Sequence, residues 1–146
     1  MEVGRRRKFG APCPQPGCCA RPALDSVSSR RWLPPLLWAA FILILTSIPG
    51  SHIPVLPFRY FDKVVHLTIY GVLGWLTARA WTDGSRVSAA VLAAIVLVSC
   101  FGAFDEWHQQ FIPLRSMELL DWAADTTGAA IGAILAMTAE RSRVSA

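Results

Sequence analysis

The chain has 146 residues, of which 53% are hydrophobic and 16% charged, and its mean hydropathy is +0.41. Ordinary soluble domains are about 45–50% apolar and about 25% charged. This composition argues against disorder over most of the length, against a collagen-like repeat and against a typical soluble enzyme, because one small core could not bury so much apolar surface. A membrane protein is the class that the composition favours.

Basic residues are concentrated at the start of the chain. Half of the 14 lysines and arginines precede the first long apolar segment: Arg5, Arg6, Arg7, Lys8, Arg21, Arg30 and Arg31. Basic residues flank apolar segments and do not alternate with aromatic residues on one face, so nucleic acid is not expected as a partner. Residues 1–30 are rich in Pro, Gly, Ser and Arg and lack apolar periodicity, which predicts a disordered tail ahead of a membrane domain at 31–146.

Four apolar segments follow the basic residues, at Leu33–Ile48, Val64–Trp81, Val87–Phe104 and Leu119–Ala139. A helix needs roughly 20 mostly apolar residues to cross a hydrocarbon core of ~30 Å. The segments therefore predict an all-α membrane protein, a bundle of four transmembrane helices joined by short loops. A cleaved signal peptide is the alternative for the first segment, but no small-x-small cleavage site follows it.

The charges in the loops predict how this bundle is oriented. Four crossings place both termini and the 82–86 loop on one side, together with most of the lysines and arginines. The opposite side holds only Arg59, Lys63 and Arg115. Because Lys and Arg accumulate in cytoplasmic loops, both termini are expected in the cytoplasm.

The other ionisable residues gather on the extracytoplasmic side of this topology. All three histidines and five carboxylates lie there, with a sixth carboxylate just inside the membrane: His52, His66, His108, Asp62, Asp105, Glu106, Glu118, Asp121 and Asp125. Several polar residues recur at helical spacing, so they share a helix face: Asp62, His66 and Tyr70; Asp105 and Gln109; Glu106 and Gln110; Asp121 and Asp125. Gly128 and Gly132 continue the last face as a stripe of small residues that lets another helix approach closely.

Asp125 is the most informative of these residues. At 1.5 Å per residue it lies about 6 Å deeper than Asp121. A charge within a membrane-spanning helix costs ~2.5–3.5 kcal/mol, so such residues usually face partners and mark functional sites. We expect Asp125 to be hydrogen-bonded, with His66 or Tyr70 as its neighbour.

The same residues form a pattern that resembles a known family. Thr46-Ser47-Ile48-Pro49-Gly50 is followed by Asp62-Lys63-x-x-His66-x-x-x-Tyr70-x-x-x-Gly74, then by Asp105-Glu106-x-x-Gln109-x-Phe111-x-Pro113-x-Arg115 and Asp121-x-x-x-Asp125-x-x-Gly128. From residue 31 to about 140 this resembles the VanZ-like family of small bacterial integral membrane proteins. Leu114 stands where that family often has glycine, and Asp125 where asparagine is frequent.

The resemblance implies a cell-envelope role in a bacterial inner (cytoplasmic) membrane. The family's namesake lowers susceptibility to the glycopeptide teicoplanin, and no reaction is attached to the family as a whole. An effect on glycopeptide susceptibility is therefore an expectation that comes from the family and not from the residues.

The residues themselves predict a polar site at the outer membrane face. His66 or His108, oriented by Asp62 or Asp105, is expected to transfer protons, because histidine titrates near neutrality and a carboxylate fixes its tautomer. Glu106, Asp121 and Asp125 complete the predicted catalytic set. Lys63 and Arg115, with Tyr70 and Gln109, are expected to hold an anionic substrate. The expected partners are membrane lipid and a lipid-linked cell-wall precursor.

Three alternatives accompany this hypothesis. A metal site is disfavoured, since no His-x-x-x-His or Glu-x-x-His pair occurs on one helix, and no cofactor is predicted. A non-catalytic protein that binds a lipid or supports a partner needs the same polar surface without turnover. A proton-coupled transporter is the least favoured alternative. The sequence shows no internal repeat, and the cytoplasmic halves of the predicted spans contain no second group of polar residues that could continue a proton path.

Overall fold

The computed structural model describes residues 24–52, 60–81 and 87–144. Every regular element in these ranges is helical, in the order α1 (Leu24–Thr46), the short 3-10 helix η1 (Gly50–His52), α2 (Phe61–Trp81), α3 (Val87–Gln109) and α4 (Leu119–Val144). The predicted all-helical class with four long helices is confirmed for the described part of the chain.

The helices extend beyond the apolar segments that predicted them. α1 begins at Leu24, inside the segment expected to be a tail, and the rest of that predicted tail lies outside the described residues. α3 continues to Gln109 and α4 to Val144. The predicted 82–86 loop also lies outside the described residues.

One described helix is long and apolar enough to cross a membrane. The candidate span is Ser88–Gln109, which makes up nearly all of α3. α1, α2 and α4 do not meet the same standard of length and apolarity, because arginines in α1 and ionisable residues in α2 and α4 interrupt their apolar sequences. The four-span topology therefore stays a prediction.

α2 and α4 form the closest helix pair, and glycines set their separation. A Cβ atom on Gly128 would lie 2.2 Å from the carbonyl oxygen of Leu67, and one on Gly132 would lie 1.8 Å from that of Gly71. These approaches leave no room for a side chain, so the predicted small-residue stripe is confirmed as a contact surface. Gly74 of α2 packs in the same way on Ala129.

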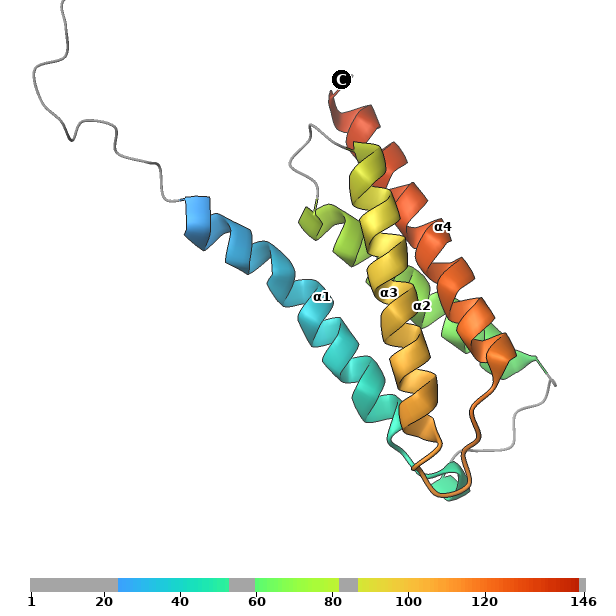
Figure 1. The fold of residues 1–146 in the computed structure, drawn as a ribbon. Coiled ribbons are helices and arrows are strands. Elements are labelled where there is room, and N and C mark those ends of the chain that lie inside the picture. The colour runs from blue at the N-terminus through green and yellow to red at the C-terminus, as the bar shows by residue number, and fades with distance from the viewer. Residues whose placement is uncertain (1–23, 53–59, 82–86, 145–146) are drawn as a thin grey trace, which may run out of the picture.

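The core between the helices changes character along the bundle. Near its middle the buried residues are mostly large: Ile42, Tyr70, Leu73, Val98 and Ala129. Farther from the polar end the buried residues are Ala78, Ala94, Ala133 and Ala136. α1 joins this core less intimately and leans away from the other helices at its N-terminal end (Figure 1). Its Trp38 donates a 2.8 Å hydrogen bond from Nε1 to the carbonyl of Ile69.

The distribution of polarity differs from that in a soluble domain, because large apolar side chains cover the outside while carboxylates are buried beside the apolar core. Each long helix exposes large apolar side chains, among them Leu37, Val64, Leu92 and Leu135. The largest fully buried side chains include two carboxylates, Asp105 and Asp125, both at 0% exposure. In water-soluble proteins, charged side chains are rarely buried unless they are paired. Large exposed hydrophobic patches mark contact with lipid or protein.

The loop between α3 and α4 is fixed against the segment that follows α1. The amide of Gly50 donates a 3.0 Å hydrogen bond to the carbonyl of Pro113, and a Cβ on Gly50 would lie 2.2 Å from the oxygen of Leu114. Leu114 itself has a φ of 59°, in the left-handed region that a branched side chain adopts at a cost. Its side chain is mostly exposed, so little apolar burial offsets that cost.

Leu114→Gly is therefore expected to stabilise the protein by about 0.5–1 kcal/mol, because relief of left-handed strain of roughly 1–2 kcal/mol outweighs the greater backbone freedom of glycine when unfolded. Thermal unfolding in detergent measures this, with the neighbouring exposed Met117→Gly as the control. A lower unfolding temperature for Leu114→Gly would contradict the assigned strain.

Candidate functional site

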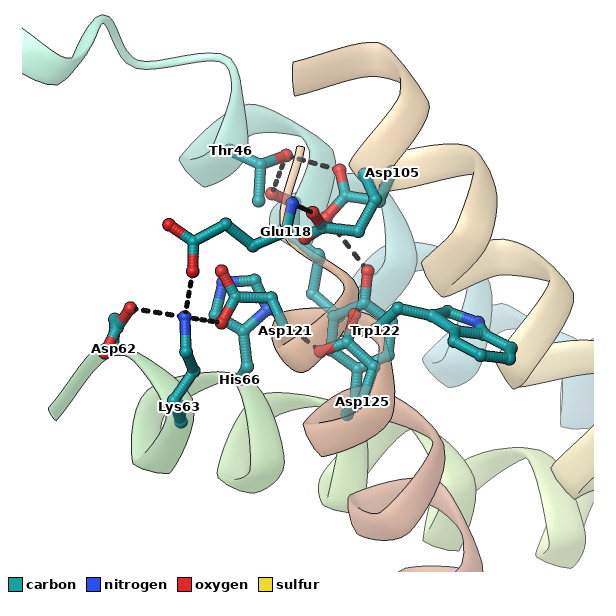
Figure 2. A network of polar contacts seen from close by, with 12 residues as sticks. Thr46, Asp62, Lys63, His66, Asp105, Glu118, Asp121, Trp122 and Asp125 are labelled. Atoms are coloured by element: carbon teal, nitrogen blue, oxygen red, sulfur yellow. Dashed lines mark hydrogen bonds and ion pairs between the residues drawn. The ribbon is translucent and has the colours of Figure 1, made fainter. Parts of the chain in front are cut away.

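The polar residues meet where four helix ends come together. The C-terminal ends of α1 and α3 and the N-terminal ends of α2 and α4 lie at the same end of the bundle (Figures 1 and 2). We call this set the polar cluster; its members are Thr46, Asp62, Lys63, His66, Tyr70, Asp105, Glu106, Gln109, Arg115, Glu118, Asp121 and Asp125.

Lys63 is the hub of the outer part of the cluster. Its Nζ lies 2.8 Å from Asp62, 2.6 Å from Glu118 and 2.5 Å from Asp121 (Figure 2). The contacts with Asp62 and Glu118 are hydrogen bonds, whereas the Asp121 oxygen meets the ammonium group as an ion pair without hydrogen-bond alignment. Lys63 thereby ties the start of α2 to the start of α4.

These contacts keep both Lys63 and Asp62 charged. Burial lowers the pKa of Lys63, but the carboxylates of Asp121, Asp62 and Glu118 outweigh burial and hold that pKa above its usual value. Burial also raises the pKa of Asp62, and Lys63 outweighs it, so this pKa lies below its usual value. The hub is thus ionised at neutral pH.

Lys63→Met is expected to lower the free energy of unfolding by about 1–3 kcal/mol, between the values for exposed and for buried ion pairs. Asp121 is 11% exposed and bears most of the loss, while Asp62 and Glu118 at 42% and 49% are screened by solvent. Lys63→Arg, which keeps the charge, serves as the control in thermal unfolding. Equal stability of Lys63→Met and the wild type would contradict the structural role of the hub.

Asp105 forms the anchor of the inner part of the cluster. One carboxylate oxygen accepts a 2.6 Å hydrogen bond from Thr46 of α1, and the other accepts a 2.9 Å hydrogen bond from Tyr70 of α2. Gln109, one turn along α3, approaches the second oxygen at 3.5 Å. Hydrogen bonds on both oxygens satisfy this buried carboxylate, and they join α3 to α1 and α2.

His66 and Asp125 form a buried pair. Their Nδ1 and Oδ1 atoms lie 2.9 Å apart, between the second turns of α2 and α4. This contact confirms the neighbour predicted for Asp125. The sequence suggested that Asp62 or Asp105 orients His66. In the structure, the carboxylate that orients His66 is Asp125. A hydrogen-bonded carboxylate fixes the tautomer and orientation of an imidazole, which is the arrangement used in proton transfer.

Glu106, Gln109 and Arg115 link the cluster to the α3–α4 loop. Glu106 accepts a 3.3 Å hydrogen bond from Gln109 and a 2.8 Å hydrogen bond from the amide of Glu118. Arg115 donates to the side-chain oxygen of Gln109 at 3.3 Å and to the carbonyls of Ile48 and Leu45. Among the described residues, no carboxylate forms an ion pair with Arg115.

The structure thus brings together all ten residues predicted for the site. Three other polar residues that the sequence grouped with them, His52, His108 and Gln110, lie outside the polar cluster. His52 is exposed and contacts Ser51, and His108 lies beside Phe104 outside the cluster. Gln110, expected to pair with Glu106, turns to the Trp107 carbonyl and the Met117 sulfur instead. His108 is therefore poorly placed to act with His66.

Two members of the cluster were missed by sequence reasoning as site residues. Thr46 lies in the Thr-Ser-Ile-Pro-Gly motif, but a threonine at the end of an apolar segment gives no sign that it bonds a carboxylate 59 positions away. Glu118 directly precedes α4, and acidic residues are common at helix N-termini because they stabilise the helix dipole. That role explains Glu118 without a distant partner, so the sequence did not point to its contact with Lys63.

Comparison with known proteins gives one family. Residues 26–140 match the model of the VanZ/LLP1 family, which is most of the chain and includes every residue of the polar cluster. No curated protein and no solved structure gives a significant match. The match confirms the resemblance that the Asp-Lys-x-x-His and Asp-Glu-x-x-Gln motifs indicated, and the chain belongs to the VanZ/LLP1 family.

Proposed function

We propose that the protein is a multi-pass membrane protein with a cell-envelope role, and that its polar cluster binds and acts on an anionic envelope lipid or lipid-linked cell-wall precursor at the extracytoplasmic face. The observation that carries the proposal is the buried His66–Asp125 pair, enclosed by a bundle whose outer surface is apolar. The family match supports a membrane protein with a link to glycopeptide resistance.

The apolar outer surface supports integration of all four helices in the membrane. Leu37 on α1, Val64 on α2 and Leu135 on α4 are each more than half exposed, as is Leu92 on the candidate span α3. Lipid tails are the environment in which such surfaces are stable while carboxylates are buried inside. The distribution of basic residues supports cytoplasmic termini, with the polar cluster at the outer face.

The different contacts of the cluster residues support chemistry at His66. Lys63 and Asp105 are saturated by protein contacts, so they build the site. His66 uses one ring nitrogen for Asp125, which leaves the other to exchange a proton with a substrate. Arg115 is partly buried, and its partners among the described residues are neutral acceptors, so its charge is the one best placed for a phosphate or carboxylate of the headgroup.

The orientation is tested with reporter fusions in the loops and at both termini. A reporter of extracytoplasmic location in the 110–118 loop should be active, and the same reporter at the C-terminus should be inactive. A cytoplasmic location for the 110–118 loop would contradict the proposed placement of the site.

The chemistry is tested in cells that lack the gene and receive it back in variant forms. The lipid and wall-precursor profile, with teicoplanin susceptibility as a second readout, should be restored by the wild type and by His108→Gln but not by His66→Gln. The two variants remove one histidine each from the same end of the bundle, and equal amounts in the membrane must be verified. Full restoration by His66→Gln would exclude proton transfer at His66 and favour non-catalytic binding.

A further inference from the structure

A group of potential metal ligands lies at the centre of the polar cluster. His66 of α2, Glu106 of α3 and Asp125 of α4 are all buried, and one ligand atom from each lies within 4.8 Å of the other two. Bonds of about 2.0–2.2 Å to one tetrahedral ion place two ligand atoms ~3.3–3.6 Å apart, so side-chain rotations that draw the three ligand atoms together would close the site.

One carboxylate oxygen in this group lacks a partner. Asp125 is fully buried, and its Oδ2 has no hydrogen bond from any described residue, although Oδ1 is bonded to His66. A buried polar atom of this kind is rare and calls for an explanation. Oδ2 faces α3, because a Cβ on Gly102 would lie 3.1 Å from it, and Gly102 is one turn before Glu106. The oxygen is therefore directed toward the helix that supplies the third ligand.

The charge of the polar cluster favours a cation. Six carboxylates (Asp62, Asp105, Glu106, Glu118, Asp121 and Asp125) face two permanent cations, Lys63 and Arg115, which leaves a formal charge of −4 when His66 is neutral. In a poorly solvated site such an excess is unfavourable unless protons or a metal ion compensate it. A divalent cation offsets half of the excess.

A second group of carboxylates shows what such a site looks like when it is filled. Asp62, Glu118 and Asp121 also present oxygens within 4.8 Å of one another, and the ammonium group of Lys63 lies among all three. Lys63 thus already supplies the cation there. The group of His66, Glu106 and Asp125 has no lysine or arginine in contact with it in the described part of the chain.

We infer that His66, Glu106 and Asp125 bind one divalent transition-metal ion of the Zn²⁺ or Mn²⁺ type. One imidazole and two carboxylates match the ligand preference of these ions. Three protein ligands leave a coordination position for water or for an anionic oxygen of a substrate, which is typical of catalytic rather than structural metal sites. The sequence analysis disfavoured a metal site because it looked for pairs of ligands spaced along a single helix. These three ligands come from three different helices.

The inference goes beyond the proposed function and does not depend on it, because the ion is measured on the purified protein. Protein in detergent is stripped with a chelator, then titrated with Zn²⁺ and, separately, with Mn²⁺, and bound metal is counted after removal of the free ion. We expect one ion per chain for at least one of the two metals, with a rise in the unfolding temperature on binding.

The variants identify the ligands. Asp125→Asn keeps an oxygen for the hydrogen bond with His66 but removes the charge, and Glu106→Gln changes the third ligand in the same way. Each should weaken binding at least about 100-fold, since even an outer-shell partner contributes roughly 10–100-fold. His108→Gln, outside the cluster, should bind as the wild type does. Size-exclusion profiles and helical content confirm that each variant is folded.

The result that overturns the inference is a folded wild-type protein that binds neither Zn²⁺ nor Mn²⁺ at one ion per chain, or binding that survives in both Asp125→Asn and Glu106→Gln. Either result leaves the lipid proposal standing, because His66→Gln tests that proposal in cells. Conversely, binding of one ion together with full rescue by His66→Gln would retain the metal site and reject the proposed chemistry.

Discussion

Replacing Gly132 by alanine is expected to force α2 and α4 apart and to destabilise the protein by about 3 kcal/mol or more. Overpacking in a well-filled core typically costs 1–3 kcal/mol, and the upper end applies when the obstacle cannot rotate away. Here the new Cβ would lie 1.8 Å from the Gly71 oxygen and 3.0 Å from the Trp75 nitrogen, both backbone atoms. Relief requires movement of a whole helix.

The control lies directly across the same interface. Gly71→Ala adds the same methyl group to α2, but its Cβ would lie 3.4 Å from the Gly128 oxygen, an ordinary contact. Because alanine is also favoured over glycine in a helix by about 1 kcal/mol, this variant should be neutral or slightly stabilising. Unfolding in detergent compares the two. Similar stability of both variants would show that the α2–α4 spacing is not fixed by Gly132.

The same stripe determines whether the site is assembled. Gly128 lies one turn beyond Asp125, and a Cβ on Gly128 would lie 2.2 Å from the oxygen of Leu67, the neighbour of His66. Any bulk there moves the two helices that hold His66 and Asp125 at 2.9 Å. We therefore expect Gly128→Ala to reduce metal binding even though it changes no ligand, with Gly71→Ala again as the control.

What the sequence predicted correctly was information carried by single helices. The i, i+4 spacing of Asp121 and Asp125 and of the two glycines placed the buried face of α4, and depth alone singled out Asp125 as a residue in need of a partner. These inferences need only helical geometry and the energetic cost of a buried charge. The family motifs indicated the family, which the match over residues 26–140 confirmed.

Apart from the neighbour of Asp125, the sequence did not predict pairing between helices. The enclosure of Lys63 by carboxylates from α2 and from the start of α4 depends on how two helix ends are aligned, and nothing in the spacing within either helix sets that alignment. The same holds for Thr46 and Asp105. A set of charges placed only on a predicted side of the membrane therefore suggested an anion-binding site at Lys63. In the structure, carboxylates of the chain itself already contact that residue.

Replacing Asp105 by leucine is expected to lower the free energy of unfolding by about 3–5 kcal/mol. The substitution leaves the Tyr70 hydroxyl, which is 0% exposed, without its 2.9 Å acceptor and removes the 2.6 Å bond from Thr46. A hydrogen bond to a charged group contributes about 1.5–3 kcal/mol, and an unsatisfied buried donor costs a further ~1–3 kcal/mol. Thr46 loses less than Tyr70, because its hydroxyl also lies 3.1 Å from the carbonyl of Ile42.

A double-mutant cycle separates this hydrogen-bond loss from the charge excess of the polar cluster. Tyr70→Phe removes the stranded hydroxyl, so the double variant Asp105→Leu/Tyr70→Phe should be more stable than the sum of the two single changes predicts. Asp105→Asn, which keeps an acceptor but no charge, should fall between wild type and Asp105→Leu. If Asp105→Leu were instead more stable than the wild type, repulsion among the carboxylates would outweigh the bonds to Tyr70 and Thr46. The contact between Thr46 of α1 and Asp105 of α3 would then lower stability, as expected of residues retained for function.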